Sequence, residues 1–87
     1  MAKPIGADRK RSSASLPKAL GAELTDRRIG SGLSQQKLAD KLGYDISYIG
    51  QLERGEKSPT LGTLINIARV FGTRLSELIR AAEERVH

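Results

Sequence analysis

The stretch from Gly32 to Gly55, GLSQQKLADKLGYDISYIGQLERG, decides the fold of this chain. Apolar residues recur in it three and four positions apart, which is the spacing of one face of an α-helix. Gly43 divides the stretch into two such segments. Because glycine readily adopts the left-handed conformation that ends helices, the pattern predicts two short helices joined by a tight turn.

Residues that commonly cap helices precede each of the two segments. Ser34 is placed to cap a helix over Gln35–Leu42, and Asp45 to cap a helix over Ile46–Arg54. Gly55 is expected to close the second of these helices. The positions expected to face inward from this pair are Leu38, Ala39, Leu42, Ile49 and Leu52. The other side chains of the helix over Ile46–Arg54 are mostly polar, so that helix is the one expected to meet a ligand.

Three further segments with helical spacing flank this pair. They run from about Pro17 to Ile29, from Leu61 to Phe71 and from Leu75 toward Val86, and Ser15 and Thr60 are the expected caps of the first two. The inward positions of the three segments are expected to be Leu20, Leu24, Ile29, Leu61, Leu64, Ile65, Ala68, Phe71, Leu75, Leu78, Ile79, Ala82 and Val86. No segment alternates apolar and polar residues with a period of two, so the chain is predicted to be all-α.

The positive charge of the chain is concentrated near its N-terminus. The 87 residues include Lys+Arg 15 and Asp+Glu 10, which gives a net charge of +5 and a pI near 10.0. Residues 1–19 hold five basic residues and one acidic residue, hence +4, and residues 20–87 hold ten and nine, hence +1. Residues 1–15 are rich in Ala, Ser, Gly and Pro and are predicted to be a flexible basic arm, followed by one small domain over residues 16–87. The arm is either a solvated tail or a segment that reaches phosphates or a minor groove.

The sequence offers little for catalysis or metal binding. It has no cysteine, and its single histidine is His87. No nucleophile with a base, Gly-rich phosphate loop or paired set of carboxylates can be assembled, so we expect no enzyme activity, no metal and no cofactor. No apolar run approaches the roughly 18 residues of a membrane span, and no apolar signal region follows the basic start. We therefore expect a cytoplasmic protein that binds a polyanion and not a membrane.

Three blocks of the sequence, GLSQQKLADKLG, SYIGQLERGEKSPTLGTL and IARVFGTRLSELI, follow the pattern of one family. From about Leu20 to Arg80 the chain resembles the lambda-repressor-like helix-turn-helix family, which includes Cro and the Xre-type regulators. The resemblance implies a compact five-helix domain in which the second and third helices form the helix-turn-helix. It also implies a transcriptional regulator, such as a repressor, that binds a specific sequence in double-stranded DNA.

The third helix carries the expected base contacts. In a helix-turn-helix, the N-terminal side chains of this helix reach base edges in the major groove, and here they are Ile46, Ser47, Tyr48 and, one turn later, Gln51. The amide of Gln51 can bond adenine N6 and N7 together, and the family often uses this position for a base contact. Ile46 offers only apolar contact, most naturally to a thymine methyl. Tyr48 is expected either to reach the sugar-phosphate wall or to pack across the helix pair.

Phosphate contacts are expected at both ends of the motif. The N–H groups and the dipole at the start of the second helix favour an anion, and the family has a matching glutamine there. Beyond the third helix, basic and hydroxyl side chains are placed to hold the adjacent strand. The expected phosphate contacts are Ser34, Gln35, Arg54, Lys57 and Thr60. Glu56 lies among the last three and would repel a phosphate.

Two charged residues have a structural role by the same resemblance. Arg28 and Glu53 match family positions where an arginine of the first helix pairs with a glutamate at the end of the third. A carboxylate directed at DNA would weaken binding, which also favours a structural role for Glu53.

A domain of this size reads only a few base pairs, so specificity requires two half-sites about 34 Å apart. We therefore predict a homodimer on a palindromic operator. The residues expected at its interface are Val70, Ala81, Ala82 and Val86. The family's fold also serves as an antitoxin or a coactivator module, so a toxin or another protein effector is the alternative partner, and the fold itself does not choose.

Overall fold

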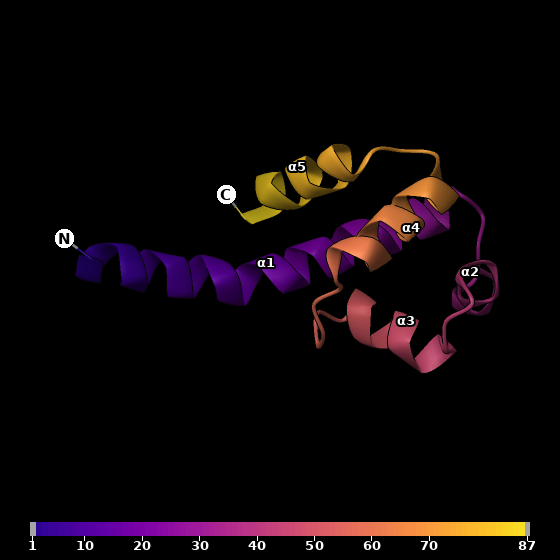
Figure 1. Cartoon of the computed structure of the whole chain (residues 1–87), viewed down its shortest axis with the longest axis horizontal. Helices are drawn as coiled ribbons and strands as arrows, with labels where there is room; N and C mark the ends of the chain where they lie inside the picture. The colour runs from indigo at the N-terminus through magenta and orange to yellow at the C-terminus, as the bar shows by residue number, and fades with distance from the viewer. Residues whose placement is uncertain (1, 87) are drawn as a thin grey trace.

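The computed structural model describes the backbone of residues 2–86 and the side chains of residues 16–86. Within that range the chain forms five helices and no strand, as the sequence predicted. In chain order they are α1 (Ala2–Gly30), α2 (Gln35–Leu42), α3 (Ile46–Glu53), α4 (Leu61–Phe71) and α5 (Leu75–Val86). α5 lies alongside α1, and α2 and α3 lie together near the C-terminal end of α1 (Figure 1).

The boundaries of the central helices follow the predicted caps. The Ser34 hydroxyl accepts a hydrogen bond from the N–H of Lys37, and Gly43 ends α2 with φ 74°, in the left-handed region. α4 runs from Leu61 to Phe71, as predicted, and α3 ends at Glu53, one residue earlier than predicted. Side-chain capping and glycine therefore fix the short segments between these helices.

Helix α1 begins much earlier than the sequence predicted. Its backbone is helical from Ala2, whereas we expected a helix to start near Pro17. Pro17 lies inside α1, although the lack of a proline N–H makes the first turn its usual place in a helix. The predicted flexible arm, residues 1–15, lies outside the part of the chain whose side chains are described, and its contribution to DNA binding remains a prediction.

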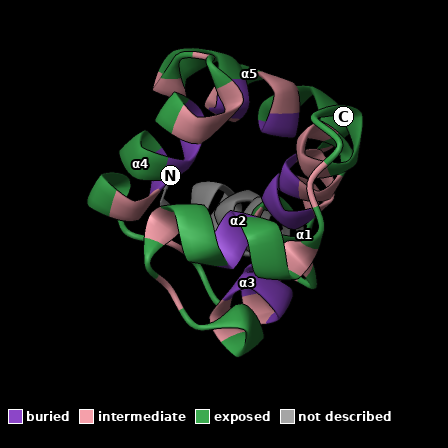
Figure 2. Cartoon of the chain, turned by 90° about the vertical axis from the view of Figure 1, so that its right-hand side faces the viewer, coloured by how far each residue is buried: buried purple, intermediate pink, exposed green. Residues whose placement is uncertain are grey.

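The buried residues form two adjoining clusters. The larger one joins α1, α3, α4 and α5 through Leu20, Leu24, Leu52, Leu64, Ile67, Ala68, Leu78 and Ala82. The smaller one joins α2 to α3 through Leu38, Ala39 and Ile49. Figure 2 shows these buried positions on the sides of the helices that face one another. The helix pair predicted from the opening stretch is thus anchored on a core built mostly by the other three helices.

The structure corrects three of the predicted core positions and adds one that was not predicted. Ile29, Leu61 and Ile65 were expected to face inward but are 61%, 68% and 39% exposed. Ile67, which we did not expect in the core, is 1% exposed. α4 carries apolar residues around much of its circumference, so spacing alone allows more than one inward face. Its contacts with α1 and α5 select the face that contains Ile67.

Candidate nucleic-acid interface

A network of three side chains fixes the end of α3 to the rest of the domain. Arg28 donates from Nε to Glu53 Oε2 at 2.6 Å and from Nη2 to Glu53 Oε1 at 3.2 Å, and its Nη1 donates to the carbonyl of Leu33 at 2.8 Å. The two charged side chains are only 13% and 6% exposed. The structure therefore contains the pair that the resemblance implied, in a two-bond geometry that suits arginine and carboxylate.

Gln35 is the third member of this network, and the sequence did not indicate that it would join the pair. Its amide Nε2 donates to Glu53 Oε1 at 2.8 Å and so links the start of α2 to the end of α3. A side-chain amide has two N–H donors, so one remains for another acceptor. Glu53 thus belongs to the scaffold, while Gln35 is held in place at the N-terminus of α2.

Gly21 lets α1 approach the end of α3 closely. A Cβ atom at this position would lie 2.5 Å from the carbonyl oxygens of both Leu52 and Glu53. Because both atoms are backbone, no side-chain rotation could relieve that overlap. No local sequence signal identifies Gly21, since its role arises from a contact between segments that are distant in the chain.

The outer face of α3 is accessible. Ile49 and Leu52 are buried against the core, while Ile46 is 40% exposed and Ser47 is exposed. Gln51 is half-buried. Ile46, Ser47 and Gln51 are therefore all at least partly accessible, and their role as base contacts stays a prediction.

Asp45 and Ser47, near the start of α3, are hydrogen bonded to each other. Asp45 Oδ1 accepts from the Ser47 N–H at 2.9 Å and from the Ser47 hydroxyl at 2.8 Å. These bonds hold the pKa of Asp45 below its usual value, the backbone bond being the larger cause. The Ser47 hydroxyl therefore has its donor engaged and is left with acceptor capacity.

Tyr48 is on α3 near the residues predicted to contact bases, but its side chain also packs against the core of the domain. It is half-buried against the larger core cluster, and its ring meets that of Tyr44 edge to face, with centroids 5.6 Å apart. The Tyr44 hydroxyl donates to the Thr63 hydroxyl at 3.5 Å and accepts from the Asn66 amide at 3.2 Å, and these bonds, the one with Thr63 foremost, lower the pKa of Tyr44. Of the two roles expected for Tyr48, its packing favours the one across the helix pair.

Beyond α3, Arg54 is paired with the acidic residue two positions later. Its Nε donates to Glu56 Oε2 at 2.8 Å and its Nη2 to Glu56 Oε1 at 3.2 Å. The bonds raise the pKa of Arg54 and lower that of Glu56. Lys57 is exposed, and the Thr60 hydroxyl caps α4 by accepting from the N–H of Thr63. The predicted phosphate contacts at this end are therefore accessible, but Arg54 already has an acidic partner.

The structure also changes the expected dimer interface. Ala82 is 0% exposed in the core of a single chain, so it cannot contact a second copy, and its predicted interface role is wrong. Ala82 belongs instead to the larger core cluster, together with Leu20 and Leu24 of α1. Val70 is half-buried and packs against the cluster of α2 and α3, rather than lying on a free surface. Ala81 and Val86 are half-buried and remain candidates.

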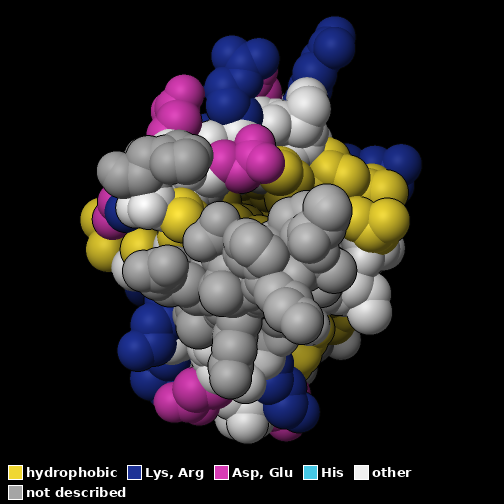
Figure 3. Space-filling model, turned by 90° about the vertical axis from the view of Figure 1, so that its left-hand side faces the viewer, with side chains coloured by type: hydrophobic (Ala, Val, Ile, Leu, Met, Phe, Trp, Pro, Cys, Tyr) yellow, Lys and Arg dark blue, Asp and Glu magenta, His cyan; other side chains and the backbone are white. Residues whose placement is uncertain are grey.

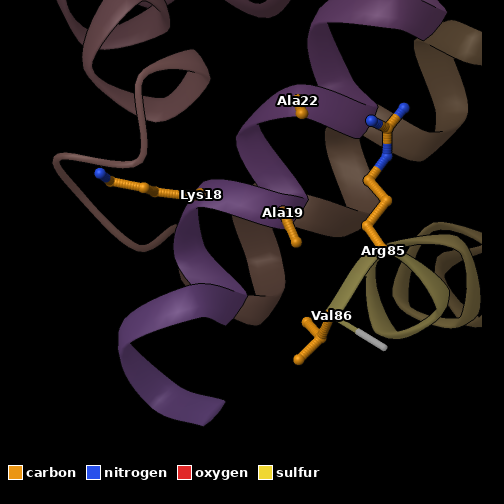
Figure 4. A pocket seen from close by; sticks show the side chains of 5 residues that line it. All are labelled: Lys18, Ala19, Ala22, Arg85 and Val86. Carbon is orange, nitrogen blue, oxygen red and sulfur yellow. The ribbon is translucent and has the colours of Figure 1, made fainter. Parts of the chain in front are cut away.

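Val86 lines an open hollow between the C-terminal end of α5 and α1. The other residues that line it are Lys18, Ala19, Ala22 and Arg85 (Figure 4). Arg85 is held there by ion pairs to Glu23 and Asp26 of α1. Figure 3, which looks at this end of the molecule, shows acidic and basic side chains interspersed around the described surface rather than one basic face.

The arrangement of α2 and α3 defines a helix-turn-helix, and a comparison with protein families agrees. A family model described as helix-turn-helix matches residues 24–78, which include α2, α3 and α4. The chain therefore belongs to the helix-turn-helix family HTH_3.

Individual relatives are consistent with this assignment. The chain is 31% identical over 67 residues to an uncharacterized HTH-type transcriptional regulator, y4dJ of Sinorhizobium fredii, covering 77% of this chain and 87% of the relative. It is 41% identical over 49 residues to the control protein C.SmaI of Serratia marcescens, covering 56% and 58%. The crystal structure of the restriction-modification controller protein C.AhdI of Aeromonas hydrophila matches with a TM-score of 0.67 and 34% identity, covering 70% and 92%.

Family, fold and relatives together give the general function of the chain. It is a DNA-binding transcriptional regulator of the helix-turn-helix type. Along residues 2–86, no helix combines the length and apolar character needed to cross a membrane.

Proposed function

We propose that the chain represses or otherwise regulates transcription by binding a palindromic operator as a homodimer, with α3 of each copy in the major groove. The observation that carries the proposal is that one face of α3 is buried and fixed to the domain while the opposite face is accessible. One face is fixed by buried Ile49 and Leu52 and by the Arg28–Glu53 pair, while the other presents accessible side chains. A helix held in this way can enter a groove without losing its orientation.

Base readout is assigned to Gln51 and Ile46, with a smaller part for Ser47. Gln51 is the residue of this face whose amide can bond adenine N6 and N7 together. Ile46, at 40% exposure, is available for a thymine methyl. Ser47 discriminates weakly because its donor is engaged by Asp45.

Phosphate contacts are assigned to the start of α2 and to the loop after α3. The early N–H groups of α2, next to Ser34, have no partner within a helix and favour an anion. The second N–H of the Gln35 amide is held beside them, since the first is bonded to Glu53. Lys57 and the backbone near Thr60 would hold the neighbouring strand.

The dimer is assigned to the end of the molecule where Ala81 and Val86 lie. Val86 borders the open hollow against α1, so a second copy could bury apolar surface there. Mass measurement in solution across a range of concentrations tests this assignment. A monomer at every concentration, combined with binding that does not depend on a second half-site, would refute the homodimer.

Selection of bound sequences from a random DNA pool, at a stated salt concentration, tests the whole proposal. We expect one half-site, repeated as an inverted pair with a fixed spacing. If no sequence is enriched over the starting pool, site-specific DNA binding is wrong for this chain. The alternative, an antitoxin or coactivator module bound to a toxin or other protein effector, would then account for the fold.

A further inference from the structure

Arg54 lies on the outer face of α3, although it follows the last residue of the helix. At 3.6 residues per turn, positions seven apart fall nearly in line, so Arg54 continues the row that begins at Ser47. Gln51, three positions earlier, borders the same row. Helical geometry therefore places Arg54 with the side chains assigned to base readout.

Gly50 makes room for the Arg54 side chain on that face. A Cβ atom at Gly50 would lie 2.9 Å from Arg54 Nη1, and the three nearest atoms to it all belong to the Arg54 guanidinium. Gly50 is buried although it lies on the outer side of α3, in contact with this side chain. The guanidinium is thus folded back along α3 and does not extend past the end of the helix.

Glu56 then changes what Arg54 can bind. The carboxylate engages Nε and Nη2, so the pair carries no net charge, while both side chains remain accessible at 60% and 54% exposure. Binding to phosphates depends on net positive charge, which the pair lacks, and Glu56 itself would repel a phosphate. The hydrogen-bond donors of Nη1 and the second N–H of Nη2 remain unused by Glu56.

We propose that Arg54, held over Gly50 by Glu56, reads a guanine in the major groove by donating to its O6 and N7. The free edge of the guanidinium has the two parallel donors that these two acceptors require. Arg54 is then a specificity-determining residue, a role that replaces the phosphate contact expected from the sequence. The inference rests on the proposed function, because it needs α3 to lie in the groove.

The decisive variant is Arg54→Ala combined with Glu56→Gln, which removes the pair without changing the net charge. Both side chains are exposed, so thermal unfolding should show the fold retained. Binding to the selected operator and to each of its single-base variants is then measured at several salt concentrations. We expect the preference for guanine at one position of the half-site to fall about 5- to 140-fold. The other base preferences should not change, nor should the salt slope, which is the slope of the logarithm of the binding constant against the logarithm of the salt concentration.

Two single variants separate base readout from phosphate binding. Lys57→Ala is the control for a phosphate contact, and it should weaken binding to all sequences alike and flatten the salt slope by about one. Glu56→Gln frees the guanidinium, so we expect stronger binding to non-operator DNA and a weaker guanine preference. If the double variant instead loses affinity equally for every sequence, Arg54 is a phosphate contact and the inference is overturned.

Failure of this inference differs from failure of the proposed function. If the unaltered protein enriches no sequence from a random pool, the proposed function fails first, and base readout by Arg54 fails with it. If the unaltered protein enriches an operator and the double variant retains every base preference, only the role of Arg54 is wrong.

Discussion

Arg28 and Glu53, 25 residues apart in the chain, form the charged contact that holds α1 to the end of α3, with Nε and Oε2 2.6 Å apart. Glu53 also accepts from Gln35 of α2, so one carboxylate joins three helices. The orientation of α3 relative to α2 therefore depends on a side chain that does not itself face DNA.

Replacing Glu53 by Gln should strongly destabilise the fold. The Arg28 side chain, 13% exposed, would keep its charge without the carboxylate that neutralises it. Removal of one partner of a buried pair costs about 3–5 kcal/mol, whereas exposed pairs contribute about 0–1 kcal/mol. Urea unfolding measures the change in the free energy of unfolding.

The matched control for Glu53→Gln is Glu56→Gln, which removes a carboxylate from the exposed pair with Arg54. It should leave the unfolding transition unchanged. A loss below about 1 kcal/mol for Glu53→Gln would show that the Arg28–Glu53 contact behaves as a surface pair.

Replacing Gly21 by Ala should also destabilise the domain, for a steric reason. The added methyl would meet the carbonyl oxygens of Leu52 and Glu53 at 2.5 Å, so α1 and α3 would have to separate. Overpacking of this kind costs about 1–3 kcal/mol. Because the contact sets the position of α3, operator affinity should fall as well, measured at a temperature where the variant remains folded.

Gly62→Ala is the control, since it makes the same chemical change in α4. There the added Cβ would meet only Thr60 Oγ1, at an ordinary contact distance of 3.8 Å. Alanine favours helix more than glycine, so this variant should be no less stable than the unaltered protein. Equal stability of the two alanine variants would contradict the close approach at Gly21.

Local chemistry and long-range contacts differ in how far the sequence reveals them. Ser34, Gly43, Thr60 and Gly72 act on their own neighbours, and from such residues the bounds of α2 and α4 could be predicted. The exposed positions of α3 followed in the same way from helical spacing. These parts of the fold and of the candidate site need no knowledge of distant segments.

Other parts depend on which helices meet. Gly21 matters only because α1 approaches α3, and the choice of Ile67 over Ile65 depends on the neighbours of α4. The contact between Gln35 and Glu53 likewise joins positions 18 residues apart. A single sequence holds no local signal for such pairs, because each pair forms only when distant segments of the chain pack together.

The N-cap of α3 should make part of the stability depend on pH. The Ser47 bonds lower the pKa of Asp45 in the folded chain, relative to an unfolded-state pKa of about 3.9. The carboxylate therefore contributes its full stabilisation above that pKa, and the contribution is lost as the pH falls through the lower, folded-state value. Asp45→Ala should lower Tm at pH 7, and its difference from the unaltered protein should shrink on acidification below pH 4.

Asp45→Asn separates the cap from the charge. The asparagine amide oxygen can accept the same N–H bond but does not titrate in this range. At pH 7 this variant should be more stable than Asp45→Ala, and the difference in Tm between these two variants should not change on acidification, because neither has a titrating side chain at position 45. If Asp45→Ala and the unaltered protein keep the same difference in Tm from pH 7 to pH 2, the ionised cap does not contribute.

Replacing Gln51 by Ala should relax the preference for adenine at one position of each half-site. The amide is the group on the outer face of α3 that can both donate to and accept from an adenine edge, and its loss should cost about 1–3 kcal/mol of discrimination. Gln36→Ala is the matched control, because Gln36 is an exposed glutamine of α2 whose amide bonds Asp40. Binding to the operator and to its single-base variants, at several salt concentrations, measures both effects. Since Gln51 carries no charge, its removal should leave the salt slope unchanged. If the Gln51→Ala variant keeps both its affinity for the operator and all its base preferences, Gln51 does not contact a base.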